Sequence, residues 1–371
     1  MKIGYFAPMS GLKAGGPETY DTCLARGLAG IDASNDYTIY CTTPNAVNSF
    51  AVQQSNFRYK TLTPSSRWIS IPLSLPLELI RKPVDLFHAT YVPPPFFPGK
   101  LIFTLLDLSP FSNPELYPPA IRMRLQFLLK TAVKRAQWVV SISEFSKQCL
   151  LERFGFPEER AVVTHLGVDP RCKVIEDREL VKHKLAHYGV TGPYAVYIGR
   201  LQARKNINRL LEAFHRAKQD GKIPHKLVFV GRRSWEANEI FETVKRLNLE
   251  EHLIHTDYVP ADDLVYFYNG ADALLYPSIF EGFGIPVIEA MACGTPVLTS
   301  NTTSLPEVAG NAAVLVDPLS VDAIADGIHD ILTDETLRGR LRRDGLERAS
   351  EFSWQKTAEK TLQVYKRAVL Q

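Results

Sequence analysis

Two glutamates bracket a Gly-x-Gly turn in the segment Glu281–Glu289. The apolar run Ala273–Tyr276 precedes this turn and the run Val297–Thr299 follows it, which predicts the order strand, turn, short helix, strand. Backbone N–H groups at a helix start bind phosphate, because they lack partners within the helix and lie at the positive end of its dipole. Carboxylates accept hydrogen bonds from sugar or ribose hydroxyl groups. A nucleotide sugar carries phosphate and hydroxyl-rich groups side by side, so this segment is a candidate to bind one.

This segment resembles the paired-glutamate motif of retaining glycosyltransferases of the GT-B fold, in particular those of glycosyltransferase family 4. The similarity extends over residues 276–318 and includes Ser304-Leu-Pro-Glu307. The resemblance implies that Glu281 contacts hydroxyl groups of the transferred sugar and that Glu289 holds the ribose. It also implies that the turn between them lies along the sugar and the diphosphate; this turn comprises Gly282, Phe283, Gly284 and Ile285. The alternative is an ordinary strand–turn–helix whose glutamates are solvated.

A basic turn follows another apolar run, Tyr194–Ile198. Arg200 comes directly after this run, and Lys205 follows five residues later, beside Arg204. In the family that the chain resembles, an arginine and a lysine at this spacing hold the donor diphosphate. Fixed cations there stabilise the negative charge that a departing diphosphate gains as the glycosidic bond breaks. The alternative is a solvated basic turn ahead of the next helix.

Three further turns are candidates for donor binding on the same resemblance. Gly15 and Gly16 allow a close backbone approach to a ligand, and the resemblance places them beside the donor phosphates and the acceptor. A tight turn without a ligand is the alternative for this pair. Gly231 resembles a turn near the nucleotide, and Tyr258 and Val259 are expected to contact its base through their backbone.

Two polar residues near predicted strand ends in the first half are candidates for contact with the acceptor. Many members of the resembling family carry a His-Asp pair where this chain has Leu106 and Asp107. Asp107 is therefore a candidate to orient the acceptor or accept its proton, with His88 nearby. The alternatives are that His88 is a hydrogen-bonded residue at a strand end and that Asp107 only caps the following loop.

Neither a metal nor a cofactor is expected from the sequence. The adjacent Asp262 and Asp263 favour a helix start over a metal site. The five cysteines are scattered and form no C-x-x-C pair, which predicts reduced thiols in a cytosolic protein rather than disulfides or a zinc site. The absence of a G-x-G-x-x-G fingerprint argues against a nicotinamide oxidoreductase.

The elements that must position these residues are parallel sheets. A chain of 371 residues exceeds one ordinary core, so two domains are expected. Continuous apolar strands separated by helical patterns predict parallel sheets covered on both faces. The expected strands are Ile3–Ala7, Tyr37–Cys41, Asp85–His88, Leu101–Leu105, Trp138–Ser141, Ala161–Thr164, Tyr194–Ile198, Leu227–Val230, Leu253–Thr256, Ala273–Tyr276, Val297–Thr299 and Ala313–Val316.

Two such sets predict an α/β protein of two Rossmann-like domains. The resemblance implies the GT-B arrangement, in which the domains face one another across a deep interdomain cleft. The N-terminal acceptor domain is expected over residues 1–170 and the C-terminal donor domain over residues 171–353. The resemblance further implies that the last helix, residues 354–371, returns to pack on the N-terminal domain.

Charge is distributed unevenly along the chain. Residues 1–175 hold 19 Lys and Arg against 13 Asp and Glu, whereas the remainder is net acidic, and the whole chain carries +3. This excess is too small to predict nucleic-acid binding, but it favours an anionic membrane surface or acceptor. Arg122–Arg135 predicts a basic amphipathic helix and is, with Trp68–Ile80, a candidate for membrane contact. A helix that only covers a sheet is the alternative. No run of about 18 apolar residues occurs.

The expected reaction is transfer of a hexose from a nucleotide sugar to an acceptor hydroxyl group with retained anomeric configuration. The overall pattern most resembles GDP-mannose-dependent mannosyltransferases of O-antigen, exopolysaccharide and lipopolysaccharide assembly. The acceptor is then a saccharide or a lipid-linked saccharide. The expected location is cytoplasmic, and the sequence leaves open whether the protein also has peripheral contact with the inner membrane. A UDP-sugar-dependent enzyme and a non-catalytic binding subunit with this fold are the alternatives. The sequence leaves the oligomeric state open.

Overall fold

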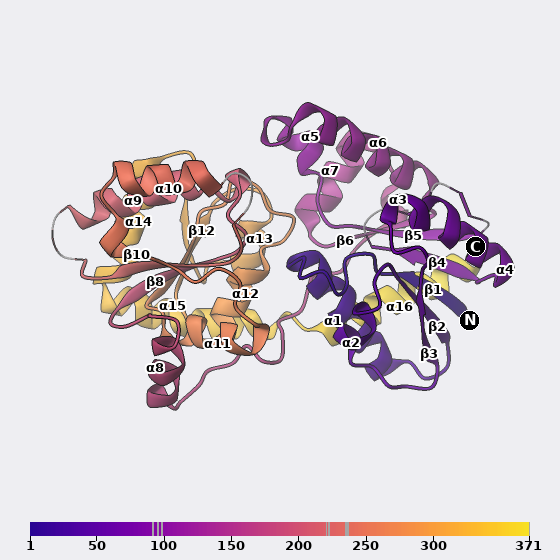
Figure 1. The fold of residues 1–371 in the computed structure, drawn as a ribbon, viewed down its shortest axis with the longest axis horizontal. Coiled ribbons are helices and arrows are strands. Elements are labelled where there is room, and N and C mark those ends of the chain that lie inside the picture. The colour runs from indigo at the N-terminus through magenta and orange to yellow at the C-terminus, as the bar shows by residue number, and fades with distance from the viewer. Residues whose placement is uncertain are drawn as a thin grey trace. The chain divides into compact units, whose positions relative to one another are not determined.

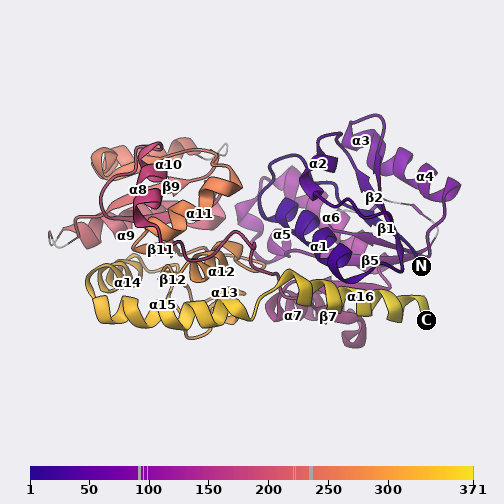
Figure 2. The same cartoon turned by 90° about the horizontal axis from the view of Figure 1, so that it is seen from below.

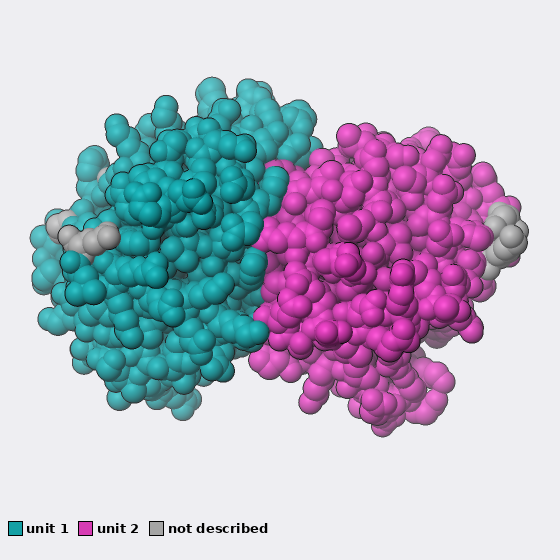
Figure 3. Space-filling view, turned by 180° about the vertical axis from the view of Figure 1, so that it is seen from behind, with its two compact units in different colours: residues 1–167, 353–371 teal, residues 168–352 magenta. Residues whose placement is uncertain are grey.

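Short runs of buried apolar residues form the strands of two parallel sheets (Figure 1). The computed structural model describes residues 1–90, 93–94, 96–97, 99–219, 221, 223–233 and 237–370. It divides into unit 1, residues 1–167 and 353–371, and unit 2, residues 168–352 (Figure 3). Each unit is built around its own sheet, with one sheet in seven-stranded order β3-β2-β1-β4-β5-β6-β7 and the other in six-stranded order β10-β9-β8-β11-β12-β13.

The sheet of unit 1 contains one strand that the sequence analysis missed. Its strands are β1 Lys2–Phe6, β2 Asp36–Cys41, β3 Phe57–Thr61, β4 Leu86–Ala89, β5 Lys100–Leu105, β6 Trp138–Ser141 and β7 Ala161–Val163. β3 is an edge strand that pairs only with β2 in the sheet order. Its burial alternates, and its sequence FRYKT lacks the apolar run that strands buried on both faces show.

Helices cover both faces of this sheet (Figures 1 and 2). The helices α1, α2 and α16 lie on one face, and α4, α6 and α7 lie on the other. The helices of unit 1 are α1 Gly16–Ile31, α2 Ala46–Phe50, α3 Arg67–Ile69, α4 Leu75–Arg81, α5 Ser109–Ser112, α6 Pro119–Arg135, α7 Glu144–Phe154 and α16 Trp354–Leu370. Residue 371, the expected end of the last helix, lies outside the described residues.

A buried network fixes α16 against the sheet of unit 1. His88 on β4 is fully buried; its Nδ1 lies 2.6 Å from the hydroxyl of Tyr365 on α16, and its Nε2 lies 2.7 Å from Oγ1 of Thr104. Thr104 also lies 2.9 Å from the hydroxyl of Tyr20 on α1. About one turn further along α16, Lys100 donates a hydrogen bond to the carbonyl of Ala368 at 2.8 Å. The C-terminal helix is therefore part of the core of unit 1.

Unit 2 has the doubly wound arrangement of a nucleotide-binding sheet. Its strands are β8 Tyr194–Ile198, β9 Lys226–Val230, β10 Leu253–His255, β11 Ala273–Tyr276, β12 Val297–Ser300 and β13 Val314–Val316. Its helices are α8 Arg178–Ala186, α9 Ile207–Lys218, α10 Ala237–Arg246, α11 Ala261–Gly270, α12 Ile285–Ala292, α13 Leu305–Ala309, α14 Val321–Thr333 and α15 Glu335–Ser350. The helices α9, α10 and α14 cover one face, and α11, α12 and α15 cover the other (Figure 1).

Within the described residues, every helix falls short of the length and apolar character that crossing a bilayer requires. The helix α16 instead packs one apolar stripe on a sheet through Ala358, Val364 and Tyr365.

Candidate functional site

The sequence of unit 2 places its candidate residues where strand order reverses. β8 and β11 are neighbours although β9 and β10 lie between them in the chain, so the helices that follow these two strands diverge to opposite faces. Parallel sheets bind ligands beyond the carboxyl ends of their strands at such a point. Arg200 follows β8 and Glu281 follows β11, so both lie at this edge.

Glu281 is the centre of a buried ionic cluster. Only 6% of this residue is exposed, and the Tyr276 hydroxyl donates to its Oε1 at 2.8 Å. The Lys205 ammonium donates to the same oxygen and to the Tyr276 hydroxyl. Arg204 Nη1 lies 3.4 Å from Oε2 of Glu281 and 3.3 Å from the Phe280 carbonyl. The basic turn and the glutamate that the sequence predicted as candidates thus meet in one cluster.

The charges of this cluster keep Glu281 ionised. Burial by itself would raise the pKa of the carboxyl group, but Lys205 and Arg204 outweigh burial and lower the pKa to about 2. At neutral pH the carboxylate therefore accepts hydrogen bonds and cannot serve as a proton donor. This is the state that suits binding of sugar hydroxyl groups.

Hydrogen bonds between loops position both partners of the ion pair. Asn206 adopts a left-handed conformation after Lys205 and donates to the carbonyls of Pro277 and Pro318 at 3.0 and 2.6 Å. The Ser304 hydroxyl donates to the Glu281 carbonyl at 2.9 Å. The loop after β8 is therefore tied to the loop after β11, which fixes ammonium and carboxylate in register.

The glycine turn leads directly into α12. Gly284 is the residue before the helix and has φ of 102°, a left-handed conformation that favours glycine. A Cβ atom at this position would also lie 2.7 Å from Leu305 Cδ2. The turn consists of Gly282, Phe283, Gly284 and Ile285, and its geometry directs the N-terminal end of α12 toward the carboxyl edge of the sheet.

Glu289 lies one turn into α12 and is also buried. The Tyr268 hydroxyl donates to its Oε2 at 2.7 Å, while Oε1 makes no hydrogen bond within the described residues. Burial raises the pKa of Glu289 to about 7; nearby Asp169 adds to the rise, and Tyr268 and Arg171 oppose it. Unlike Glu281, this carboxyl group has no direct ion pair among the residues that the structure describes, so a ligand that donates hydrogen bonds would favour its charged form.

The remaining candidates of unit 2 lie around the same edge. Arg200 is exposed, and its guanidinium makes no hydrogen bond or ion pair within the described residues. Gly231 follows β9 with φ of 148°, and a Cβ there would lie 2.0 Å from the Gly199 carbonyl oxygen. Tyr258, 42% exposed, and buried Val259 follow β10. The structure brings neither Arg200 nor Tyr258 into contact with Glu281.

The glycine loop of unit 1 is held by a glutamate. Gly15 precedes α1 with φ of 74°, and Gly16 begins the helix. Both carboxylate oxygens of Glu18 accept backbone hydrogen bonds, from Gly11 and Ala14, at 2.8 Å each. This loop follows β1 at the carboxyl edge of its own sheet, where the strand order also reverses, between β1 and β4.

Asp107 forms a local loop cap. Its Oδ1 accepts hydrogen bonds from the backbone and the hydroxyl of Ser109, at 3.1 and 2.6 Å. The Ser109 hydroxyl in turn lies 2.6 Å from that of Tyr117. The second Asp107 oxygen makes no hydrogen bond within the described residues, so capping does not use the whole carboxylate.

His88 has a structural role in this structure. Both of its ring nitrogens are bonded to core groups, and burial lowers the pKa of the imidazole to about 3. The neutral ring is fully buried between β4, β5 and α16, which leaves neither nitrogen for a ligand. The structure therefore supports the structural alternative for this residue.

The described residues contain no group of three or more His, Cys, Asp and Glu side chains that could hold a metal ion. The five cysteines all lie among the described residues, and none of them forms a disulfide.

Sequence reasoning missed two tyrosines of this site and gave Arg204 no role. Tyr276 contacts Glu281 from the end of β11, and Tyr268 contacts Glu289 from α11. Tyrosine within an apolar run predicts a core position, so the sequence carried no signal that these hydroxyl groups lie against carboxylates. Arg204 stood beside Lys205 in the basic turn, and its contact with Glu281 depends on the tertiary approach of two loops.

Two protein-family models together match most of the chain. Residues 181–348 match the model of "Glycosyl transferases group 1", and residues 14–171 match that of "Glycosyltransferase Family 4". The O-antigen chain mannosyltransferase B of Escherichia coli is 37% identical over 272 residues, which are 72% of this chain and 70% of that protein.

Solved structures of low sequence identity share the fold over nearly the whole chain. Sucrose-phosphate synthase from Thermosynechococcus elongatus superposes with a TM-score of 0.80 and 21% identity, covering 99% of this chain and 98% of that one. Anabaena Alr3699/HepE in complex with UDP and glucose superposes with a TM-score of 0.77 and 19% identity, covering 99% and 100%. Together with the two parallel-sheet units, these similarities confirm the predicted fold class.

Proposed function

The chain belongs to glycosyltransferase family 4, and we propose that it transfers mannose from GDP-mannose to a hydroxyl group of a saccharide or lipid-linked saccharide during assembly of a bacterial surface polysaccharide. The observation that carries the proposal is the buried cluster of Glu281, Lys205, Arg204 and Tyr276 at the switch point of unit 2. The choice of mannose is supported by the similarity to an O-antigen mannosyltransferase.

The cluster and the residues around it at the carboxyl edge of the sheet supply the two kinds of group that a nucleotide sugar requires. In this proposal the ionised carboxylate of Glu281 accepts hydrogen bonds from sugar hydroxyl groups, and Oε1 of Glu289 accepts them from the ribose. The N-terminal end of α12 and the Arg200 guanidinium then meet the diphosphate. Both carboxylates and α12 belong to one strand–helix unit, so their spacing is fixed by the fold.

Stabilisation of the leaving group is the main catalytic contribution that we assign to this chain. Negative charge develops on the diphosphate as the glycosidic bond breaks, and preorganised cations lower the barrier because they need not reorganise. Arg200 and Lys205 supply this charge, while Lys205 also orients Glu281. We further propose that the configuration at the anomeric carbon is retained, with the leaving diphosphate helping to deprotonate the acceptor, and that no bound metal takes part.

A donor panel tests the proposed substrate. Calorimetric titration with GDP-mannose, UDP-glucose, UDP-N-acetylglucosamine and GDP should give the tightest binding for GDP-mannose, and transfer to a lipid-linked acceptor should give an α-linked product by NMR. Tightest binding and turnover with a UDP-sugar would favour the alternative donor, which the similarity to a protein solved with UDP and glucose supports. Complete loss of activity in EDTA with rescue by magnesium would contradict the metal-free mechanism.

Unit 1 presents a surface suited to a lipid-linked acceptor. On α6, Met123 and Phe127 are 64% and 68% exposed, so this helix directs large apolar side chains to solvent. Trp68, before the bend into α4, is 75% exposed, and the Arg124 guanidinium lies 5.2 Å from its ring. Apolar groups interleaved with arginines match the interface of an anionic bilayer. We propose that this surface holds the enzyme on the membrane.

Vesicle sedimentation distinguishes membrane contact from mere exposure. The chain should bind vesicles containing phosphatidylglycerol and bind phosphatidylcholine vesicles weakly, and Met123→Glu with Phe127→Glu should abolish the difference. Leu319→Glu, at a 61% exposed site of unit 2, is the matched control and should leave binding unchanged. Equal binding by all three proteins would contradict the proposal.

A further inference from the structure

A pocket lies in unit 2, at the edge of the sheet opposite to Glu281. It has a volume of about 720 Å³, in the range that accommodates a small organic ligand. Tyr194, Asp272 and Pro296 line it at the amino ends of β8, β11 and β12. Because all strands of the sheet are parallel, this edge lies away from the carboxyl edge, so the pocket is separate from the proposed donor site.

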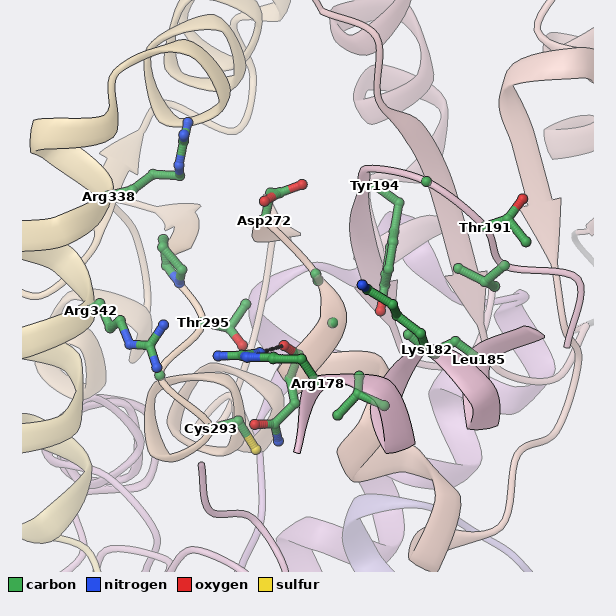
Figure 4. Close-up of a pocket in the computed structure, with 18 of the residues that line it drawn as sticks. Arg178, Lys182, Leu185, Thr191, Tyr194, Asp272, Cys293, Thr295, Arg338 and Arg342 are labelled. Atoms are coloured by element: carbon green, nitrogen blue, oxygen red, sulfur yellow. Dashed lines mark hydrogen bonds between the residues drawn. The ribbon is translucent and has the colours of Figure 1, made fainter. Parts of the chain in front are cut away.

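Each of two helices contributes two cationic side chains to this pocket. Arg178 and Lys182 are four residues apart on α8, and Arg338 and Arg342 are four residues apart on α15, so each pair shares one helix face. Figure 4 shows Arg178 and Arg342 extended toward one another across the pocket. Among the described residues that line the pocket, Asp272 is the only carboxylate.

The positive charge of the pocket is poorly neutralised. The Arg342 guanidinium makes no hydrogen bond or ion pair within the described residues, and Arg178 donates to a backbone carbonyl, that of Asn269, at 2.7 Å. Asp272 is itself 3.2 Å from His225 Nε2. Two guanidinium groups that face each other repel, and an anion between them removes this repulsion.

Each of the other two cations forms an ion pair with an exposed glutamate. Lys182 lies 2.8 Å from Glu179, and Arg338 lies 3.9 Å from Glu335; both of these glutamates are at least 84% exposed at their side chains. Such pairs contribute little and exchange readily for a stronger partner. Arg338 Nη1 also donates to the carbonyl of Ile331 at 3.3 Å, whereas Lys182 has no further partner within the described residues, so Lys182 is the side chain available to turn toward an anion in the pocket.

We propose that this pocket binds a phosphorylated small molecule, with its phosphate between Arg178 and Arg342. Guanidinium groups match phosphate oxygens through paired N–H donors, which favours phosphate over a spherical anion. The apolar side chains of Val181, Leu185 and Val190 form a wall that suits the ring or chain that carries the phosphate. The ligand class is an organic phosphate such as a sugar phosphate.

Occupancy of this pocket has a direct connection to Glu289. The Thr295 hydroxyl, on the pocket wall, donates to the carbonyl of Tyr268 at 2.6 Å, and the hydroxyl of Tyr268 holds Glu289. A ligand that shifts Thr295 or Asn269 thus acts on the residue that orients this carboxylate. The effect on Glu289 rests on the proposed function, whereas the proposed binding of a phosphate in the pocket does not. By linkage, the donor and the pocket ligand would change each other's affinity by the same factor.

Calorimetric titration of the full chain with glucose 6-phosphate, inorganic phosphate and glucose tests the site. We expect the sugar phosphate to bind more tightly than phosphate and glucose not to bind. The double substitution Arg338→Gln with Arg342→Gln should raise the Kd at least tenfold. Its matched control, Arg340→Gln with Arg343→Gln, removes the same charge from exposed positions of α15 that do not line the pocket, and should leave the Kd unchanged.

Arg200→Gln separates this pocket from the donor site. It should leave binding of glucose 6-phosphate unchanged while weakening binding of GDP-mannose. Glucose 6-phosphate binding that is lost in Arg200→Gln but unaffected by the α15 substitutions would show that the ligand binds at the donor site. This result would overturn the proposed binding at the pocket and leave the proposed function intact. Equal effects of the two α15 double substitutions, or no binding of any phosphate by the native chain, would also overturn it.

Discussion

Each unit buries a hydrogen-bonded network near the carboxyl ends of its strands. The network of unit 1 is neutral, and that of unit 2 is ionised. In unit 1, His88 is neutral, because burial lowers its pKa to about 3, and the hydroxyls of Tyr365 and Thr104 occupy both of its nitrogens. In unit 2, Glu281 is ionised beside Lys205. The first network ends within the core, whereas the second lies at the edge where the strand order reverses.

This difference separates a core group from a binding group. A buried polar side chain at a strand end could serve either purpose, and the remaining hydrogen-bonding capacity decides between them. Both nitrogens of His88 are occupied, whereas a carboxylate oxygen accepts more than one hydrogen bond, and Oε2 of Glu281 has only the 3.4 Å contact with Arg204 within the described residues. The predictions that follow change one network at a time and compare stability with activity.

Lys205→Ala has the largest expected effect on both properties. It leaves the buried Glu281 charge without its main partner, which should cost about 3–5 kcal/mol of unfolding free energy. It should also lower kcat/KM on the order of 10²–10³-fold through lost transition-state stabilisation. Urea unfolding and transfer kinetics measure the two effects.

A double substitution separates these two losses. Lys205→Met with Glu281→Leu replaces both charges by apolar groups and should recover most of the stability, because paired removal leaves no uncompensated charge. Activity should stay lost. Recovery of activity together with stability would show that the ion pair only supports the fold.

His88→Ala should affect stability alone. Loss of a buried ring and two hydrogen bonds should cost roughly 2–4 kcal/mol of unfolding free energy. Below the unfolding temperature, kcat/KM should remain within about threefold of the native value, since the change remains in the core. Tyr365→Phe is the milder companion and should cost about 1–2 kcal/mol. A hundredfold loss of activity with unchanged stability would return His88 to the catalytic candidates.

Donor binding should strengthen as the pH rises through the titration of Glu289. The pKa of this group is raised to about 7 in the free protein, and ribose hydroxyl groups favour its ionised form. Affinity for GDP-mannose should therefore increase about tenfold between pH 6 and pH 8, with proton release on binding. Calorimetry in buffers of different ionisation enthalpy measures both quantities.

Glu289→Gln provides the control for this pH dependence, because the amide does not titrate and its binding curve should be flat across this range. The stability of the free protein should change in the opposite direction. An acid whose pKa is raised on folding stabilises the fold below its unfolded pKa, near 4.5, and this contribution is lost as the pH rises toward 7. A native protein whose affinity does not change with pH would contradict the assignment.

Asp107 should show the smallest effect. Asp107→Ala removes the cap on Ser109 and should cost about 1 kcal/mol of unfolding free energy, whereas Asp107→Asn keeps an acceptor and should cost less. If the residue only caps its loop, Asp107→Asn should retain native kcat/KM. A loss of more than about tenfold in Asp107→Asn with unchanged stability would instead support a role in orienting the acceptor.

The sequence predicted the sheets well because most of their strands are continuous apolar runs. Edge strand β3 was missed, since one half-exposed strand of alternating residues resembles a loop. The segment around Glu281 and Glu289 was predicted as a strand, a turn and a helix, and the structure has β11, the turn and α12 at these residues.

Contacts between distant loops were beyond the sequence. The pattern identified Lys205 and Glu281 separately, but it did not show that the lysine would bind the glutamate directly, 76 residues away in the chain. The pattern likewise made His88 a candidate, because the sequence around a histidine at a strand end does not show whether a helix such as α16 or a ligand contacts it. Such assignments depend on which helix packs over which strand end.

A crystal structure with GDP-mannose tests the central claim most directly. The account predicts that the ribose donates hydrogen bonds to Glu289, that the sugar hydroxyl groups lie within hydrogen-bond distance of Glu281, and that the diphosphate contacts Arg200 or Lys205. A nucleotide bound elsewhere, for example between α8 and α15, with all four side chains unoccupied, would contradict it.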